Sequence, residues 1–131
     1  MIRDIVQLLA NMEPVLNPGT YAFVTAPVGV PIPPDQIVAS IREKEGLSLV
    51  VPEKLARELN LPVSYPAAWI TLTVHSDHAA VGLTAAFSNA LGQAGISCNV
   101  IAGVHHDHLF VPAEEAQRAM AVLKRLQGSA G

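Results

Sequence analysis

The chain has 131 residues, half of them apolar and 15% charged, with a formal net charge of −3. This composition predicts a packed globular protein, and it argues against disorder and against the basic surfaces that bind nucleic acid or anionic lipid. The apolar runs fall far short of the roughly 20 residues that span a bilayer, and the N-terminus lacks a signal-peptide pattern, so no membrane association is expected.

The first half of the sequence alternates apolar segments with proline and glycine breaks. Helical spacing of apolar residues predicts a helix over 3–12, and a strand is expected at 21–25 after a turn. The proline-rich segment 27–34 predicts a loop. Residues 35–45 show helical spacing and precede Gly46, which predicts a second helix, followed by a strand at 47–51 and a short helix at 53–59.

The second half gives a clearer pattern. It predicts a strand at 68–74, a polar loop at 75–78, a helix at 79–94 and a strand at 96–102. A turn at 105–107, a strand at 108–111 and a helix at 113–126 follow. Each half has a Val-Pro pair before a helix, at Val51-Pro52 and Val111-Pro112. The matching order of elements predicts a duplication, with units over residues 1–66 and 67–131.

Two halves of this kind predict an α+β protein of two ferredoxin-like βαββα units, whose antiparallel sheets carry helices on one face. Five segments resemble the ACT domains, and they are residues 16–23, 45–50, 81–84, 95–100 and 106–112. The chain is most similar to small bacterial proteins made of two ACT-like units. The resemblance implies a regulatory module that binds an amino acid or a similar small ligand, usually where two units pair edge to edge.

The candidate ligand site lies in the second half. Many ACT units place a glycine soon after an aspartate in the first strand–helix loop, whereas here Asp77 is followed by Gly82, deeper in the helix, and the first half has a proline-rich loop instead. Free N–H groups at the helix N-terminus would favour a carboxylate, and Asn99 would orient an ammonium group. The candidate ligand-binding residues are His75, Ser76, Asp77, His78, Gly82 and Asn99. The alternative is that Asp77 only caps the helix, Gly82 only packs and Asn99 pairs with a turn.

The five histidines all lie between His75 and His108. Neutral imidazoles with Asp77 or Asp107 would suit zinc or nickel, but no spacing matches a zinc site, and His105 and His106 point to opposite sides of an extended backbone. We therefore interpret them as polar turn residues, with His108 hydrogen-bonded near the sheet edge, and we predict no metal and no cofactor.

Catalysis is not expected. Ser76 lacks a glycine-flanked elbow, and Cys98 shares strand parity with apolar residues that face the core. Cys98 is also the only cysteine, which excludes an internal disulfide and favours a cytoplasmic location. The sequence thus predicts a non-enzymatic, homodimeric protein that binds a small molecule. The alternative is a structural or interaction module that pairs with itself or with an enzyme through its sheet edges.

Overall fold

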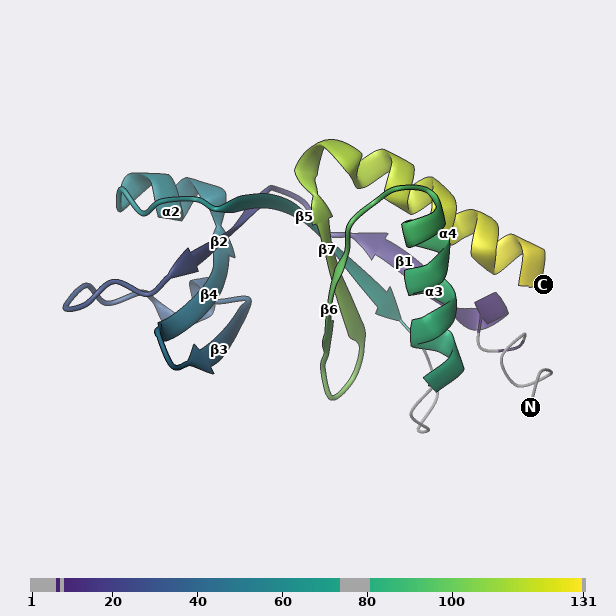
Figure 1. Ribbon diagram of the computed structural model, residues 1–131, viewed down its shortest axis with the longest axis horizontal. Coiled ribbons are helices and arrows are strands. Elements are labelled where there is room, and N and C mark those ends of the chain that lie inside the picture. The colour runs from purple at the N-terminus through teal and green to yellow at the C-terminus, as the bar shows by residue number, and fades with distance from the viewer. Residues whose placement is uncertain (1–6, 8, 74–80, 131) are drawn as a thin grey trace.

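The computed structural model of the chain describes residues 7, 9–73 and 81–130. Within these residues, seven strands form one sheet in the order β3-β4-β2-β5-β7-β6, and β1 also pairs with β5. Figure 1 shows β5 passing from one half of the molecule to the other. In chain order the elements are β1 (Glu13–Leu16), β2 (Tyr21–Thr25), the 3-10 helix η1 (Pro34–Gln36), β3 (Ala39–Glu43), β4 (Gly46–Pro52), α2 (Glu53–Glu58), β5 (Tyr65–Thr73), α3 (Val81–Gln93), β6 (Asn99–Ala102), β7 (Asp107–Pro112), the 3-10 helix η2 (Ala113–Glu115) and α4 (Ala116–Ala130).

The two units share strands. The start of β5 pairs with β2, from Tyr21 opposite Ala67 to Phe23 opposite Tyr65, and so completes the first unit. The end of β5 pairs with β1, from Glu13 opposite Thr73 to Leu16 opposite Ile70. The N-terminal strand therefore lies in the sheet of the second unit, and the two units are interlocked.

Most predicted elements are confirmed, and so is the α+β class with two ACT-type units. Pro52 and Pro112 end β4 and β7 and directly precede helical segments, with nearly the same backbone angles, φ −56° and ψ 136° against φ −53° and ψ 136°. This agreement supports the duplication that the sequence predicted. All strand pairs are antiparallel in the described part of the chain.

The helix predicted over residues 35–45 is wrong. Only η1 forms there, and β3 follows as an edge strand that pairs with β4 from Ala39 opposite Val50 to Glu43 opposite Gly46. Pro33 and Pro34 stand at the start of η1, where proline restricts the backbone. The backbone N–H and C=O groups along one edge of β4 then pair with β3 over its full length. Gly46 ends a hairpin turn with φ +147° and does not cap a helix.

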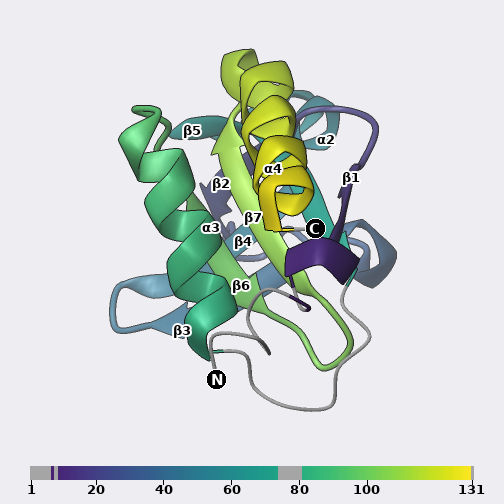
Figure 2. The same ribbon diagram turned by 90° about the vertical axis from the view of Figure 1, so that its right-hand side faces the viewer.

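The face of the sheet that the helices cover holds two hydrophobic cores, a larger one under α3 and α4 and a smaller one under α2. α3 and α4 cover β5 and β7 in Figure 2, and the core beneath them contains Leu83, Phe87 and Leu91 with Ile70, Leu72 and Leu109. Met12, which is fully buried, and Leu9 enter this same core from the N-terminal segment. A smaller core forms under α2 from Ala22, Val24, Leu49, Val51 and Ala56.

The opposite face of the sheet carries an aromatic cluster that we call the inter-unit seam. Its buried members are Val50, Ala67 and Phe110, and the partly buried side chains around them are Tyr21, Phe23, Val38, Ala39, Tyr65, Trp69 and Ile101. Val38 directly precedes β3, and the others come from β2, β3 and β4 of the first unit and from β5, β6 and β7 of the second. The seam therefore joins the two units on the face that the described helices leave uncovered.

Among the described residues, no helix is both long and apolar enough to cross a membrane.

Candidate functional site

The predicted ligand site is described only in part. His75, Ser76, Asp77 and His78 lie outside the described residues. Gly82 is half-buried in the first turn of α3. That turn follows the end of β5, where Leu72 lies opposite Asp107 and Asp107 opposite Ala102.

Asn99 lies far from Gly82 within one chain. It is the first residue of β6 and is paired with Phe110, at the opposite end of the strand from Ala102. α3 has 13 residues between these two ends, and at about 1.5 Å per residue it is nearly 20 Å long. Because Phe110 faces the seam, Asn99 also lies on the helix-free face of the sheet, where it is exposed.

The backbone before Asn99 is fixed by the end of α3. Gly95 adopts φ +76°, and Ile96 N–H donates to Leu91 O at 2.9 Å, which is the pattern of a Schellman cap. Ile96 is then buried beside Leu91 in the core. The alternation predicted a strand that begins at Ile96. Because the cap holds Ile96, β6 begins only at Asn99.

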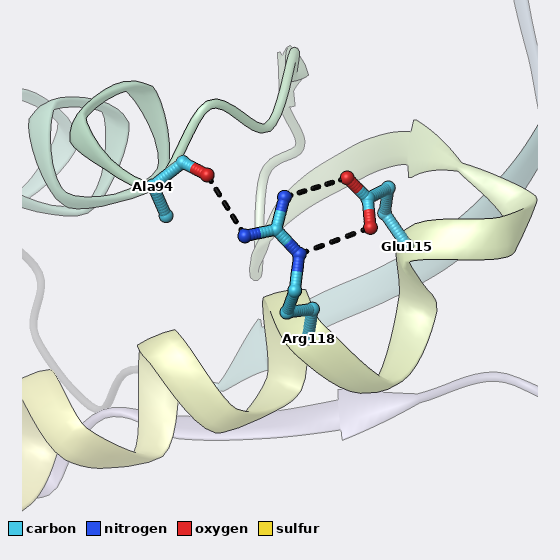
Figure 3. A network of polar contacts seen from close by, with 3 residues as sticks. All are labelled: Ala94, Glu115 and Arg118. Carbon is cyan, nitrogen blue, oxygen red and sulfur yellow. Dashed lines mark hydrogen bonds and ion pairs between the residues drawn. The ribbon is translucent and has the colours of Figure 1, made fainter.

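An arginine on α4 completes that cap (Figure 3). Arg118 Nη1 donates to Ala94 O at 2.9 Å, a carbonyl at the end of α3. The same guanidinium holds both carboxylate oxygens of Glu115, at 3.0 and 2.7 Å. These bonds lower the pKa of Glu115, and they connect the end of α3 to the start of α4.

A polar network crosses the helix-free face near the seam. Asn17 Nδ2 donates to Thr71 Oγ1 at 2.9 Å, and Asn17 N donates to Trp69 O at 2.9 Å. Trp69 Nε1 donates to His108 Nδ1 at 3.0 Å, and Thr71 Oγ1 lies 3.2 Å from the same nitrogen. The network links the turn after β1 to β5 and β7.

The bond from Trp69 fixes the tautomer of His108. Since Nδ1 accepts a hydrogen bond, the neutral ring carries its proton on Nε2. A protonated Nε2 does not bind a metal, so this arrangement opposes the use of His108 as a ligand. Burial and the nearby His106 lower the pKa of His108, while Asp107 opposes them.

The other described histidines lie at the β6–β7 turn. His105 is exposed and His106 is half-buried, with their rings 6.4 Å apart. No group of three His, Cys, Asp or Glu side chains that could hold a metal ion occurs in the described ranges. His108 is hydrogen-bonded near the sheet edge as predicted, but its partner Trp69 was not foreseen. Placing residues 69 and 108 on adjacent strands in the correct register would have been needed to find it.

Aromatic rings pack around this network. Tyr21 meets the edge of Trp69 at 5.3 Å, and Trp69 stacks on Phe110 at 6.3 Å. Phe23 contacts both Tyr65 and Phe110, at 5.4 and 5.5 Å. Burial raises the pKa values of Tyr21 and Tyr65, so both phenols stay neutral. The seam is therefore uncharged.

Cys98 lies just before β6 and is half-buried, and burial raises the pKa of its thiol. A raised pKa disfavours the reactive thiolate. Cys98 packs against the core beneath α3 and α4, as its strand parity with apolar residues predicted.

Comparison with known proteins supports the two-unit fold. Two models of the ACT domain match the sequence, one over residues 2–68 and the other over residues 64–125. A Vibrio cholerae protein of unknown function, VC0802, described as a possible transport protein, is 43% identical. The match covers 96% of this chain and 98% of that chain, with a TM-score of 0.82. No curated protein matches the chain.

More distant structures share the fold. Atu0741 from Agrobacterium tumefaciens is 18% identical over 89% of this chain and 90% of that one, with a TM-score of 0.69. The ligand-free regulatory subunit of aspartate kinase from Thermus thermophilus is 12% identical over 86% of this chain and 95% of that one, with a TM-score of 0.62. Both similarities extend over most of the two-unit arrangement.

Proposed function

Because the chain belongs to the ACT domain family, we propose that it is a regulatory protein that binds a small molecule, an amino acid or a close relative of one. The observation that carries this proposal is the pair of ACT domains, which together occupy residues 2–125. ACT domains are regulatory rather than catalytic, so we propose no enzymatic activity. The single cysteine, which excludes an internal disulfide, supports a cytoplasmic location.

Distant structural relatives support an amino acid as the ligand. Aspartokinase III of E. coli, described as a complex with aspartate and ADP, matches 88% of this chain and 32% of that one, at 13% identity and a TM-score of 0.56. That similarity shows a shared fold. The ligand named there makes amino acids the first class of compound to test.

We place the ligand at the N-terminus of α3, with residues 75–78 and Gly82. Free N–H groups at this end of a helix favour a carboxylate. Asn99 lies too far from Gly82 in the same chain, so we propose that a second copy supplies it. The two copies would form a two-fold symmetric homodimer through their β6 edges.

The topology supports this dimer. β6 ends the described sheet, and its outer edge has no partner strand in the described residues. Antiparallel pairing of two β6 strands would bring the Asn99 end of one strand beside the Ala102 end of the other. Ala102 lies at the end of the sheet where α3 begins, so this pairing would bring Asn99 of one copy to the same end of the sheet as the proposed carboxylate site of the other. Light scattering should then give the mass of a dimer, and a monomer at high concentration would contradict this arrangement.

A thermal-shift screen against amino acids tests the proposed function. A ligand at one hundred times its dissociation constant stabilises a protein by about 2.7 kcal/mol, so a specific amino acid should raise the melting temperature clearly. The amide of the same amino acid is the matched control and should shift it less, because it lacks the carboxylate. A screen in which every amino acid leaves the melting temperature unchanged would contradict the proposal.

The second candidate function is an interaction module without a small-molecule ligand. Ile41 on the edge strand β3 is 55% exposed and Leu47 on β4 is 40% exposed, so this hairpin carries exposed apolar side chains at the edge of the sheet. A protein of this kind would co-purify with a partner and ignore small molecules.

A further inference from the structure

The bond between Trp69 and His108 depends on the protonation state of one nitrogen. His108 Nδ1 accepts from Trp69 Nε1 at 3.0 Å and lies 3.2 Å from Thr71 Oγ1. The bond from Trp69 needs the lone pair of Nδ1, whereas the Thr71 hydroxyl can either donate to this nitrogen or accept from it. An imidazolium ring carries a proton on each nitrogen and has no lone pair to offer.

Trp69 is also a member of the inter-unit seam. Its ring lies 5.3 Å from Tyr21 of the first unit and 6.3 Å from Phe110 of the second. Its position between these two rings makes the orientation of the indole important for the contact between the units.

We propose that Trp69 and His108 form a pH-sensitive clasp on the inter-unit seam. In the closed state, neutral His108 accepts the indole N–H and holds the ring between Tyr21 and Phe110. In the open state, a proton from solvent occupies Nδ1, and the indole N–H then faces another N–H. Trp69 loses its partner, and the seam between the two units loosens.

The charged groups near His108 come mainly from its own strand. His106 lies two residues away, just before β7, while Asp107 on β7 points to the other face of the sheet. A charge on His106 disfavours the imidazolium form of His108, and the carboxylate of Asp107 favours it.

The neighbouring described elements add no opposing charge. β5 presents only Trp69 and Thr71 to His108, and the part of β6 from Asn99 to Ala102 contains no titratable side chain. Glu13 on β1 is exposed and reaches Gln127 of α4, at 3.5 Å. Tyr21 on β2 packs against Trp69, and burial raises its pKa.

Burial and His106 together hold the pKa of His108 below its ordinary value. The clasp is thus closed at neutral pH and opens in mild acid. Trp69 is the only tryptophan of the chain, so its signals report this site alone.

Nitrogen-15 NMR of the intact protein tests the closed state. At neutral pH, His108 should be the neutral ring with its proton on Nε2, and the single indole N–H of Trp69 should be shifted downfield by its hydrogen bond. On acidification the indole signal should move with the titration of His108. If the ring instead carries its proton on Nδ1 at neutral pH, the proposal is wrong.

Variants separate His108 from the other turn histidines. His108→Gln offers an uncharged side-chain oxygen to Trp69 at every pH, so the acid transition of the Trp69 fluorescence should disappear. His105→Gln is the matched control at an exposed position and should keep the transition. His106→Gln should move the midpoint to higher pH, because it removes a group that lowers the pKa of His108.

Hydrogen exchange measures whether the seam opens. Backbone amides of β5 and β7 should exchange about tenfold faster once His108 is protonated, since one hydrogen bond of ordinary strength is lost. The His108→Gln protein should show no such pH-dependent step. A fluorescence transition that persists in His108→Gln, or equal exchange in the two states of the wild type, would overturn the proposal.

Discussion

At the scale of single residues, His108 ties the stability of the protein to pH. Its pKa is lowered in the folded state, mainly by burial. The unfolded chain therefore binds more protons than the folded one between the lowered pKa and the ordinary value of about 6.5. The stabilisation is fully present above the ordinary value and is lost as the pH falls through the lowered one.

Urea unfolding at a series of pH values measures this dependence. The unfolding free energy of the wild type should fall as the pH drops below the ordinary histidine range, and His108→Gln should show a flatter profile over that interval. Identical profiles for the two proteins would show that His108 does not contribute.

Arg118 makes a second residue-scale contribution, because its guanidinium contacts Ala94 O and both oxygens of Glu115 at once. Arg118→Lys keeps the charge but cannot reproduce this forked geometry, so it should lower the melting temperature. Arg125→Lys, at another exposed position on α4, is the matched control and should change it less. Equal melting temperatures for the two variants would mean that the fork adds nothing beyond charge.

The candidate site shows how far single-residue reasoning reaches. Alternation in β6 correctly separates Asn99 and Ile101 from Val100. It does not reveal that Asn99 faces the side without described helices, because that depends on its register with Phe110. Distance along the chain also misleads here, since the length of α3 separates Gly82 from Asn99.

At the scale of elements, β1 is the part that the sequence did not predict. The sequence predicted a helix over 3–12 and no strand before 21–25, yet the register sets Pro14 opposite Leu72 within an antiparallel pair. Short edge strands carry little pattern of their own, and pairing with a distant strand decides their structure. The failed helix at 35–45 has the same cause, because β4 supplies the partner that turns Ala39–Glu43 into a strand.

The segment just before β1 should be essential for the core of the second unit. Met12 is fully buried among residues of that core, so Met12→Ala should cost about 2–5 kcal/mol of unfolding free energy. Val28→Ala is the control, because Val28 is completely exposed. Chemical denaturation of both variants measures the difference, and a cost for Met12→Ala no larger than for Val28→Ala would contradict this placement.

At the scale of the whole molecule, shared strands and the seam should make the two units one cooperative structure. A fragment of residues 68–131 lacks β1, Leu9 and Met12, and it leaves one edge of β5 open. We expect it to aggregate or remain molten, because half of the chain has too little core without this strand.

A permuted fragment is the control for that prediction. Gln127 of α4 lies 3.3 Å from the carbonyl of Ala10, so the two ends of the second unit are close in space. Residues 7–20, joined after residue 131 by a short glycine linker, should therefore supply β1 and restore a sharp unfolding transition. A well-folded fragment 68–131 without this addition would refute the essential role of the shared strand.

Calorimetric titration with the amino acid that raises the melting temperature tests the central claim most directly. The account predicts saturable binding to the wild type. It also predicts that Asn99→Ala binds about tenfold or more weakly, since a charge-assisted hydrogen bond contributes about 1.5–3 kcal/mol. Asn89→Ala, an exposed change on α3, should bind like the wild type. Equal affinities for wild type and Asn99→Ala would remove Asn99 from the site, and no binding of any amino acid would contradict the proposed function itself.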